Sequence, residues 1–231
     1  MPSTPPFRRW PPILPSFRVS SRSGGFSVLL PVLAAMALFL AWGCSGPGTS
    51  QAGLSFQISF SQDLHSEVQD GRIILILANN DEAEPRFQYR IYDPRTQPGF
   101  GVDVEGLSPG EAAVVDGATF GFPVRSLDDL PPGEYFVQAL LNRYETFHRS
   151  DGHTVKLPPD RWEGQHWNIK PGNFYSVPRM VSLDPDRGGT VQISMTEEIP
   201  PIPEPEDTPW VKHFRIRSEL LSEFWGRPMY L

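Results

Sequence analysis

The chain of 231 residues contains a single cysteine, Cys44. No intrachain disulfide can form, and no thiol lies in the part of the chain that follows. A serine hydrolase on an α/β fold needs its nucleophile on a sharp strand-to-helix turn, and we predict no such turn here. Outside the first 44 residues, no segment keeps a 3.6-residue apolar period over three helical turns. These absences predict a non-enzymatic chain, without a cofactor, that folds by packing strands.

The first 44 residues have the composition of an export signal. Four arginines and no acidic residue precede Cys44, and an apolar run covers positions 26–42. A basic region followed by an apolar one is typical of a secretory signal. Residues 40–44 resemble the bacterial lipobox, in which the cysteine carries the lipid. We therefore predict a lipoprotein-type signal over residues 1–44, lipidation of Cys44, and a flexible tether over residues 45–53.

Two alternatives for this region stay open, a signal cleaved without lipidation and an uncleaved N-terminal anchor. All three predict export to the periplasm or cell envelope, because the arginines precede the apolar run. Of the 20 basic residues, four precede Cys44, which leaves 16 against 27 acidic residues and a net charge of −11. This charge argues against nucleic acid as a partner, so the expected membrane contact is the N-terminal lipid or anchor.

Apolar and polar residues alternate in the part that follows the tether. Positions 54, 56, 58 and 60 are apolar and the positions between them are polar, the pattern of a strand with one buried face. Further strands are expected at 72–78, 87–91, 112–115, 134–142, 153–157, 174–182 and 189–196. Turns rich in Pro and Gly separate them. The sequence predicts an all-β sandwich over residues 54–196.

One local pattern indicates the class of sandwich. Gly133 stands two residues before Tyr135 at the start of the strand expected at 134–142. This resembles the tyrosine corner of immunoglobulin-like and fibronectin-like domains, in which the tyrosine hydroxyl bonds back to the preceding loop. We therefore expect an immunoglobulin-like or fibronectin-like sandwich.

The C-terminal part changes character. Residues 197–209 are rich in proline and glutamate, which predicts an extended linker. Residues 210–231 resemble a strand, a turn and the start of a second strand, with no partner strand in the sequence and no polar tail after Leu231. We expect this orphan strand to open a second domain that continues beyond the chain.

Aromatic residues are concentrated in one loop-rich region of the predicted sandwich. Tyr144, Trp162 and Trp167 lie there beside His166 and several amides. Exposed aromatic rings next to amide groups are typical of sugar-binding modules, whereas the same rings also cap a sandwich or dock a neighbouring domain. These four residues are the candidate ligand or docking site.

Metal-binding patterns are weak. Asp184 and Asp186 could ligate calcium but lack the spaced oxygen ligands of an established loop. Asp151, His153 and His166 lack the spacing of a credible metal site. We expect solvated turns and hydrogen-bonded loop histidines at these positions, and no metal.

Four segments carry a resemblance to a family. Residues 151–155, 162–167, 171–176 and 220–228 resemble the N-terminal half of large exported bacterial esterases. The catalytic half of that family is an α/β-hydrolase similar to enterochelin esterase and esterase D. The resemblance covers residues 54–231 and implies a hydrolase domain C-terminal to this chain. The family's catalytic Ser, acidic residue and His would all lie beyond Leu231, so no catalytic residue carries over.

The sequence thus predicts a non-catalytic accessory sandwich of an exported esterase-like protein, truncated before its hydrolase domain. The main alternative is a free-standing envelope lipoprotein that binds carbohydrate or another ring-bearing ligand through the aromatic loops. A third hypothesis is a structural envelope protein that binds another protein through an open sheet edge.

Overall fold

The computed structural model describes residues 53–90 and 92–231. The predicted signal, Cys44 and all of the predicted tether except its last residue lie outside these residues. The strands are β1 (Leu54–Phe60), β2 (Gln69–Ala78), β3 (Gly99–Leu107), β4 (Ala113–Val115), β5 (Gly121–Phe122), β6 (Gly133–Arg143), β7 (Glu145–His148), β8 (Thr154–Leu157), β9 (Phe174–Tyr175), β10 (Arg179–Leu183), β11 (Gly189–Met195) and β12 (Glu197–Glu198). The helices are α2 (Pro85–Gln88), the 3-10 turn η1 (Leu127–Asp129) and α3 (Glu219–Trp225). The all-β prediction is confirmed.

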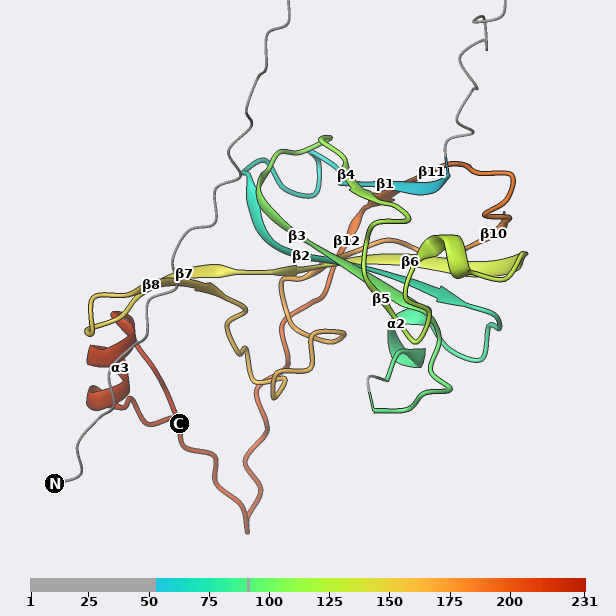
Figure 1. Cartoon of the computed structure of the whole chain (residues 1–231). Coiled ribbons are helices and arrows are strands. Elements are labelled where there is room, and N and C mark those ends of the chain that lie inside the picture. Colours follow the sequence, from blue (N-terminus) through green and yellow to red (C-terminus); the bar gives the residue numbers. More distant parts are fainter. Residues whose placement is uncertain (1–52, 91) are drawn as a thin grey trace, which may run out of the picture. The chain divides into compact units, whose positions relative to one another are not determined.

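Two sheets form the body of the fold (Figure 1). The smaller sheet has the order β11-β1-β4, and the larger has the order β12-β9-β6-β2-β3-β5, with β10 also paired to β6. A separate hairpin consists of β7 and β8. Strand β1 runs parallel to β11, whereas the other pairings of named strands are antiparallel.

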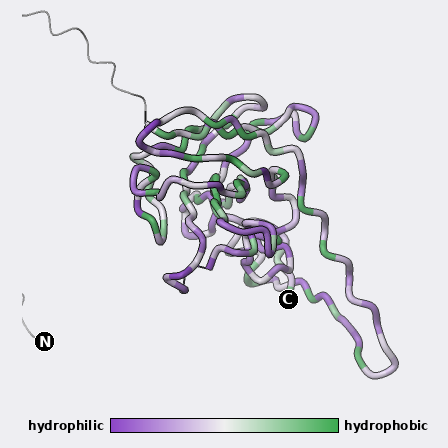
Figure 2. Tube along the Cα trace, turned by 90° about the vertical axis from the view of Figure 1, so that its right-hand side faces the viewer, coloured by the Kyte–Doolittle hydropathy of each residue, from purple (hydrophilic) through white to green (hydrophobic). Residues whose placement is uncertain are grey.

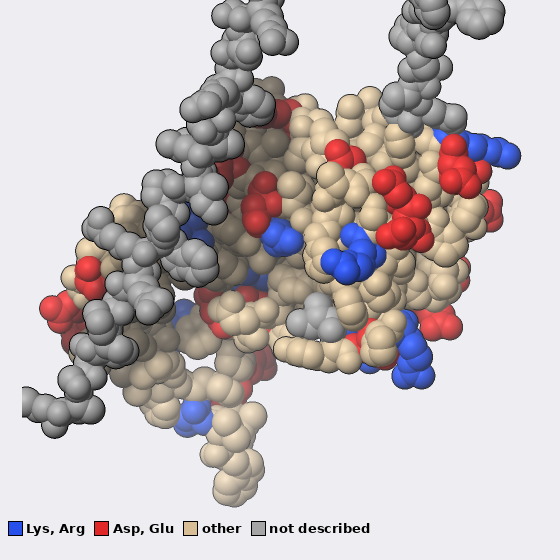
Figure 3. Space-filling view, in the orientation of Figure 1, with Lys and Arg blue, Asp and Glu red and all other residues tan. Residues whose placement is uncertain are grey.

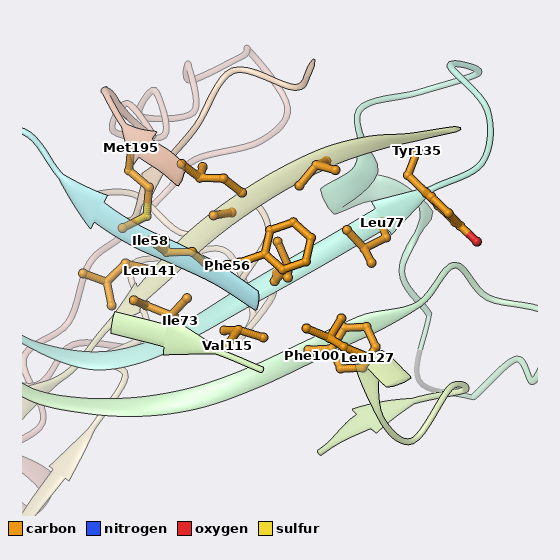
Figure 4. Packing of buried hydrophobic residues seen from close by; sticks show 14 of the residues in the cluster. Phe56, Ile58, Ile73, Leu77, Phe100, Val115, Leu127, Tyr135, Leu141 and Met195 are labelled. Carbon is orange, nitrogen blue, oxygen red and sulfur yellow. The ribbon is translucent and has the colours of Figure 1, made fainter. Parts of the chain in front are cut away.

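The core lies between the inner faces of these two sheets (Figure 4). Alternate residues of a strand point to opposite faces, so the four apolar side chains of β1 all face inward. They meet apolar residues of β2, β3 and β6, including Leu77, Phe100 and Leu141. Strand β1, the first of the described strands, pairs with β11, which is close to the last. Burial of this core therefore depends on strands from both ends of the sandwich sequence.

The outer face of the larger sheet is also covered. Gln138 of β6 points away from the core and is fully buried. Its Oε1 accepts a hydrogen bond from the Arg86 backbone N–H (3.0 Å), and its Nε2 donates to Ser176 O (3.0 Å) and Glu84 Oε2 (3.0 Å). Arg86 also donates to Asn168 O at 3.3 Å. Helix α2 and the loop over residues 158–173 are thereby held over this face.

The tyrosine at the start of β6 makes the hydrogen bond expected from the sequence. Tyr135 is buried, and its hydroxyl donates to Pro131 O at 2.8 Å. This bond ties the strand to the loop that precedes it.

The strand expected at 87–91 is wrong for residues 87–90, and residue 91 lies outside the described residues. Pro85 fixes φ at a helical value and starts α2, and the alternating aromatic residues after it lie on that turn and the segment beyond it. Strand β3 was missed because glycines interrupt its pattern. A Cβ at Gly99 would lie 2.5 Å from the Tyr89 ring, and one at Gly101 would lie 2.7 Å from Arg72 Nε. The glycines leave room for side chains that cover the strand.

The C-terminal part differs from the expected orphan strand. Residues 197 and 198 pair with β9 as β12, and residues 199–216 then form a long loop without regular structure (Figure 2). Beyond it comes helix α3, and the extended residues on its two sides pair with each other. Ile216 and Leu231 exchange two backbone hydrogen bonds (3.1 and 2.8 Å). The backbone of Leu231 is therefore paired inside the chain, which corrects the expectation that it has no partner.

Local sequence explains helix α3. The Ser218 side chain accepts from the Leu221 N–H (3.3 Å) as N-cap, and Gly226 ends the helix in the left-handed conformation with φ 66°. A strand through this stretch would leave both capping groups unused.

Candidate functional site

The four candidate residues do not form one aromatic platform. Trp167 is half-buried and packs edge-on against Tyr89, with 6.1 Å between ring centroids. Its backbone carbonyl accepts from Asn173 Nδ2 at 2.8 Å. Trp167 therefore helps to hold the loop over residues 158–173, here called the aromatic loop, on the sheet.

Tyr144 and His166 have different surroundings. Tyr144 is half-buried at the junction of β6 and β7, and its backbone N–H donates to Asp70 O at 2.9 Å. Burial raises the pKa of its hydroxyl, with a further contribution from Asp103. His166 is exposed on the loop.

Trp162 is the most exposed of the four, with 57% of its surface accessible. Its backbone has φ 78°, a conformation that costs a non-glycine residue roughly 1 kcal/mol or more. Asp160 Oδ1 accepts from its N–H at 2.7 Å and supports this turn. The Arg215 guanidinium lies 5.0 Å from the centre of its ring. Residues 199–216, here called the C-terminal loop, therefore contact the aromatic loop at this residue.

Buried charged side chains attach the aromatic loop to the larger sheet. Lys170 is only 3% exposed, and its ammonium donates to Arg143 O at 2.6 Å. Burial lowers the pKa of Lys170 to about 8, although the charge of Glu163 acts in the opposite direction. Glu163 is 5% exposed, and its Oε2 accepts from the Arg161 N–H at 2.6 Å. Its Oε1 has no hydrogen-bond partner among the described residues.

Glu145 connects three separate parts of the chain. Its Oε1 accepts from Arg161 on the aromatic loop, and its Oε2 accepts from Arg227, which follows α3. Partial burial acts to raise the pKa of Glu145, but the hydrogen bonds and charges of the two arginines outweigh it and lower that pKa. Over the face of the protein seen in Figure 3, other acidic and basic side chains are interspersed without forming a region of one sign. The Arg161–Glu145–Arg227 group therefore ties the C-terminal segment to β7.

Apolar and aromatic contacts reinforce this attachment. The Phe147 ring on β7 meets Trp225 of α3 edge-on, with 5.5 Å between centroids. The Ser150 N–H donates to Phe224 O at 2.8 Å. At Gly226 a Cβ would lie 2.5 Å from the His148 carbonyl oxygen, so only glycine allows this approach. Helix α3 is thus packed closely on the β7–β8 hairpin.

The rest of the C-terminal segment exposes its apolar side chains. Trp210 is 93% exposed, Phe214 80% and Leu220 79%. We call the exposed apolar residues of this segment the C-terminal surface: Trp210, Val211, Phe214, Ile216, Leu220, Tyr230 and Leu231. Isolated exposed apolar residues are normal, whereas a contiguous exposed apolar patch is typical of an interaction surface.

The acidic and histidine positions considered for metal binding act within their own turns. Asp184 Oδ1 accepts from the Asp186 N–H at 3.1 Å, and Asp151 Oδ1 lies 3.2 Å from His153 Nδ1. Within residues 53–90 and 92–231, no group of three or more His, Cys, Asp or Glu residues is arranged to hold a metal ion.

A G-x-S-x-G pattern does occur at residues 106–110, although no nucleophile turn was expected. Ser108 lies between strands β3 and β4, whereas a hydrolase nucleophile needs a strand followed by a helix. Its N–H donates to Glu111 Oε2 at 3.0 Å, and its carbonyl accepts from the Glu111 N–H at 3.0 Å. The pattern here forms a tight turn between strands.

Sequence reasoning missed the charged residues that organise this region. Glu145, Arg161 and Arg227 are far apart in the chain and belong to no motif. The capping residues of α3, Ser218 and Gly226, were the one local signal that could have placed Arg227 after a helix.

Comparisons with family models, with curated proteins and with solved structures give no match to this chain. Among the described residues, no helix has the length and apolar character needed to cross a membrane.

Proposed function

We propose that the chain is the non-catalytic accessory domain of an exported, lipid-anchored protein. In this proposal the C-terminal surface holds an α/β-hydrolase domain, and the sandwich supplies the rigid support. The sandwich itself would belong to the immunoglobulin-like or fibronectin-like class, which the Tyr135–Pro131 hydrogen bond supports.

The exposure of the C-terminal surface is the observation that carries the proposal. Leaving three large apolar side chains about four-fifths or more exposed forgoes roughly 1.5–3 kcal/mol of burial for each. A protein partner that covers Trp210, Phe214 and Leu220 would recover much of this free energy. Aromatic residues are enriched at such contacts.

The attachment of α3 fixes the part of this surface that the helix carries, around Leu220. Glu145, Phe147 and Ser150 fix the helix from one side. A partner that bound the exposed side would therefore be held in a defined orientation relative to the β7–β8 hairpin. Trp210 and Phe214 lie on the loop before the helix, so Leu220 would set this orientation.

A second candidate function is binding of a ring-bearing ligand, such as carbohydrate, at Trp162. The exposed ring and its left-handed backbone favour it. Arg215 already lies over that ring, however, so a ligand would have to displace the C-terminal loop. In the docking proposal the contact between Arg215 and Trp162 can remain, because the partner binds the C-terminal surface.

The test begins with the gene sequence after the codon for Leu231. If it encodes an α/β-hydrolase domain, that domain is produced separately and its binding to the chain is measured by calorimetry. We expect the Phe214→Ser/Leu220→Ser variant to bind at least tenfold more weakly. Val68→Ser is the control, because Val68 is also exposed, at 60%, but lies outside the C-terminal surface.

The absence of an encoded hydrolase domain, or equal binding by the double variant and the control, would reject the docking proposal. Glycan binding that is lost in Trp162→Ala would support the second candidate instead. The chain alone is expected to show no turnover of p-nitrophenyl acetate.

A further inference from the structure

A concave surface lies on the outer face of the smaller sheet, away from the aromatic loop and the C-terminal loop. It is a groove of about 620 Å³, within the range of ligand sites in proteins. Its floor consists of Gln57 and Ser59 from β1 and Gln192 and Ser194 from β11. Its sides come from the segment before β10 and from the turn before β4.

The floor residues stand in register. Gln57 pairs with Gln192 and Ser59 with Ser194 across the parallel strands, and Ser55 continues the series opposite Thr190. Side chains on one face of a strand repeat every second residue, so these rows recur about every 6.6 Å. The face thus presents a regular ladder of amide and hydroxyl groups.

These groups are available to a ligand. None of the four floor side chains makes a hydrogen bond to another described residue, whereas Ser55 Oγ and Thr190 Oγ1 are 3.0 Å apart. Each amide offers donors and an acceptor, and each hydroxyl offers both.

The groove is also nearly free of charge. Arg179 is the one charged residue among its lining residues, and its guanidinium donates to the backbone carbonyl of Gln192. Edge strands in solvent commonly carry charged side chains, which discourage unwanted pairing. Strand β11 is an edge strand, yet its outward positions Thr190, Gln192 and Ser194 are uncharged.

We propose that this groove binds a neutral polysaccharide chain that lies along β1 and β11. A chain of sugars offers repeated hydroxyl donors and acceptors and no formal charge, which matches the composition of the floor. The lining contains no aromatic residue for stacking, so affinity would come from many weak hydrogen bonds along the chain. This proposal is independent of the docking function of the C-terminal surface.

The groove and Trp162 belong to opposite sides of the fold. The aromatic loop covers the outer face of the larger sheet, through Asn168 and Arg86, whereas the groove lies on the outer face of the smaller one. Binding at one site can therefore be separated from binding at the other by mutation.

The test is native affinity electrophoresis of the full chain in gels that contain a soluble mixed-linkage β-glucan, dextran or polygalacturonate. We expect at least one of the two neutral polymers to retard the chain and polygalacturonate to have less effect. Ser194→Arg places a long charged side chain on the floor and should weaken retardation at least tenfold. Ser182→Arg makes the same change at an exposed strand position outside the groove and should bind as wild type does.

Gln192→Ala is a second, milder variant, which removes one amide without adding bulk and should weaken binding severalfold. No retardation by either neutral polymer would overturn the proposal. Retardation that persists in Ser194→Arg but is lost in Trp162→Ala would also overturn it and assign sugar binding to the aromatic loop. Self-association of the wild-type chain that Ser194→Arg abolishes, without sugar binding, would identify the face as a contact between copies.

Discussion

Single residues with unusual surroundings hold the aromatic loop in place. Lys170 is a charged side chain that the fold removes almost completely from water. Trp162 keeps a backbone conformation that glycine would adopt more easily. Both the burial of Lys170 and the backbone conformation of Trp162 lower the stability of the folded protein, so surrounding contacts must offset each cost. At Lys170 the balancing contact is the hydrogen bond to Arg143 O.

Lys170→Met should change how stability depends on pH. Burial lowers the pKa of Lys170 from 10.5 to about 8, so above pH 8 the unfolded chain binds more protons than the folded one. The free energy of unfolding of the wild type should therefore gain about 2 kcal/mol from this residue between pH 7.5 and 9.5. The variant should lose this rise in urea denaturation.

Lys212→Met serves as the control for this prediction, because Lys212 is exposed and pairs with Asp207, an exposed residue of the same loop. It should keep the rise with pH. Equal pH dependence in Lys170→Met and the wild type would show that Lys170 does not titrate in this range.

At the scale of elements, side-chain contacts attach the short helix α3 to the β7–β8 hairpin. Helix α3 has its own caps, but at seven residues it is too short to be stable alone in water. Its packing on β7 and β8 supplies the missing stability. Glu145 is central to that packing because it binds one arginine from each neighbouring segment.

Glu145→Gln should loosen α3. The ion pairs are partly exposed, so the loss should be about 1 kcal/mol. Amides of residues 221–225 should exchange with deuterium about fivefold faster, measured by mass spectrometry. Glu223→Gln, an exposed change on the helix itself, should leave the exchange nearly unchanged.

Lowering the pH should have the same effect in the wild-type protein. The folded pKa of Glu145 is below its ordinary value of 4.5, so its contribution is complete above that pH. The contribution is lost as the pH falls through the lower folded pKa. The protection factors of the α3 amides, which are corrected for the intrinsic exchange rate at each pH, should therefore fall in the wild type only below about pH 4.5, and this fall should be smaller in Glu145→Gln. Identical acid responses would contradict this role.

For the whole molecule, the two surfaces proposed for binding lie on different parts of the fold. The C-terminal surface is apolar, and its part on α3 packs on the β7–β8 hairpin, whereas the groove has an uncharged floor and lies on the outer face of the smaller sheet. One protein could use the first to hold a domain and the second to bind a polysaccharide. The predicted lipid at Cys44 would keep both at a membrane surface.

Cys44→Ala tests that predicted anchor. Loss of the thiol should abolish labelling of the chain by radioactive palmitate in an expressing bacterium. The protein should then shift from the membrane fraction to another fraction. Unchanged labelling would rule out Cys44 as the lipid site, and membrane retention without labelling in the wild type would favour an uncleaved anchor.

The sequence by itself determined the features that depend on local pattern. Alternating residues 54–60 had to bury one face, and the strand of Tyr135 followed from its alternation and the preceding turn. The caps of α3 were also present in the sequence, although the strand pattern obscured them.

Only the tertiary structure decided which distant residues meet. The pairing of β1 with β11 created the uncharged ladder, because neither strand alone forms a groove. Glu145, Arg161 and Arg227 came together only through the packing of the hairpin, loop and helix. The exposure of Trp162 and the burial of Lys170, eight residues apart on one loop, were likewise set by the sheet beneath them. Local spacing carries no information on such contacts, because burial depends on which surfaces the folded chain covers.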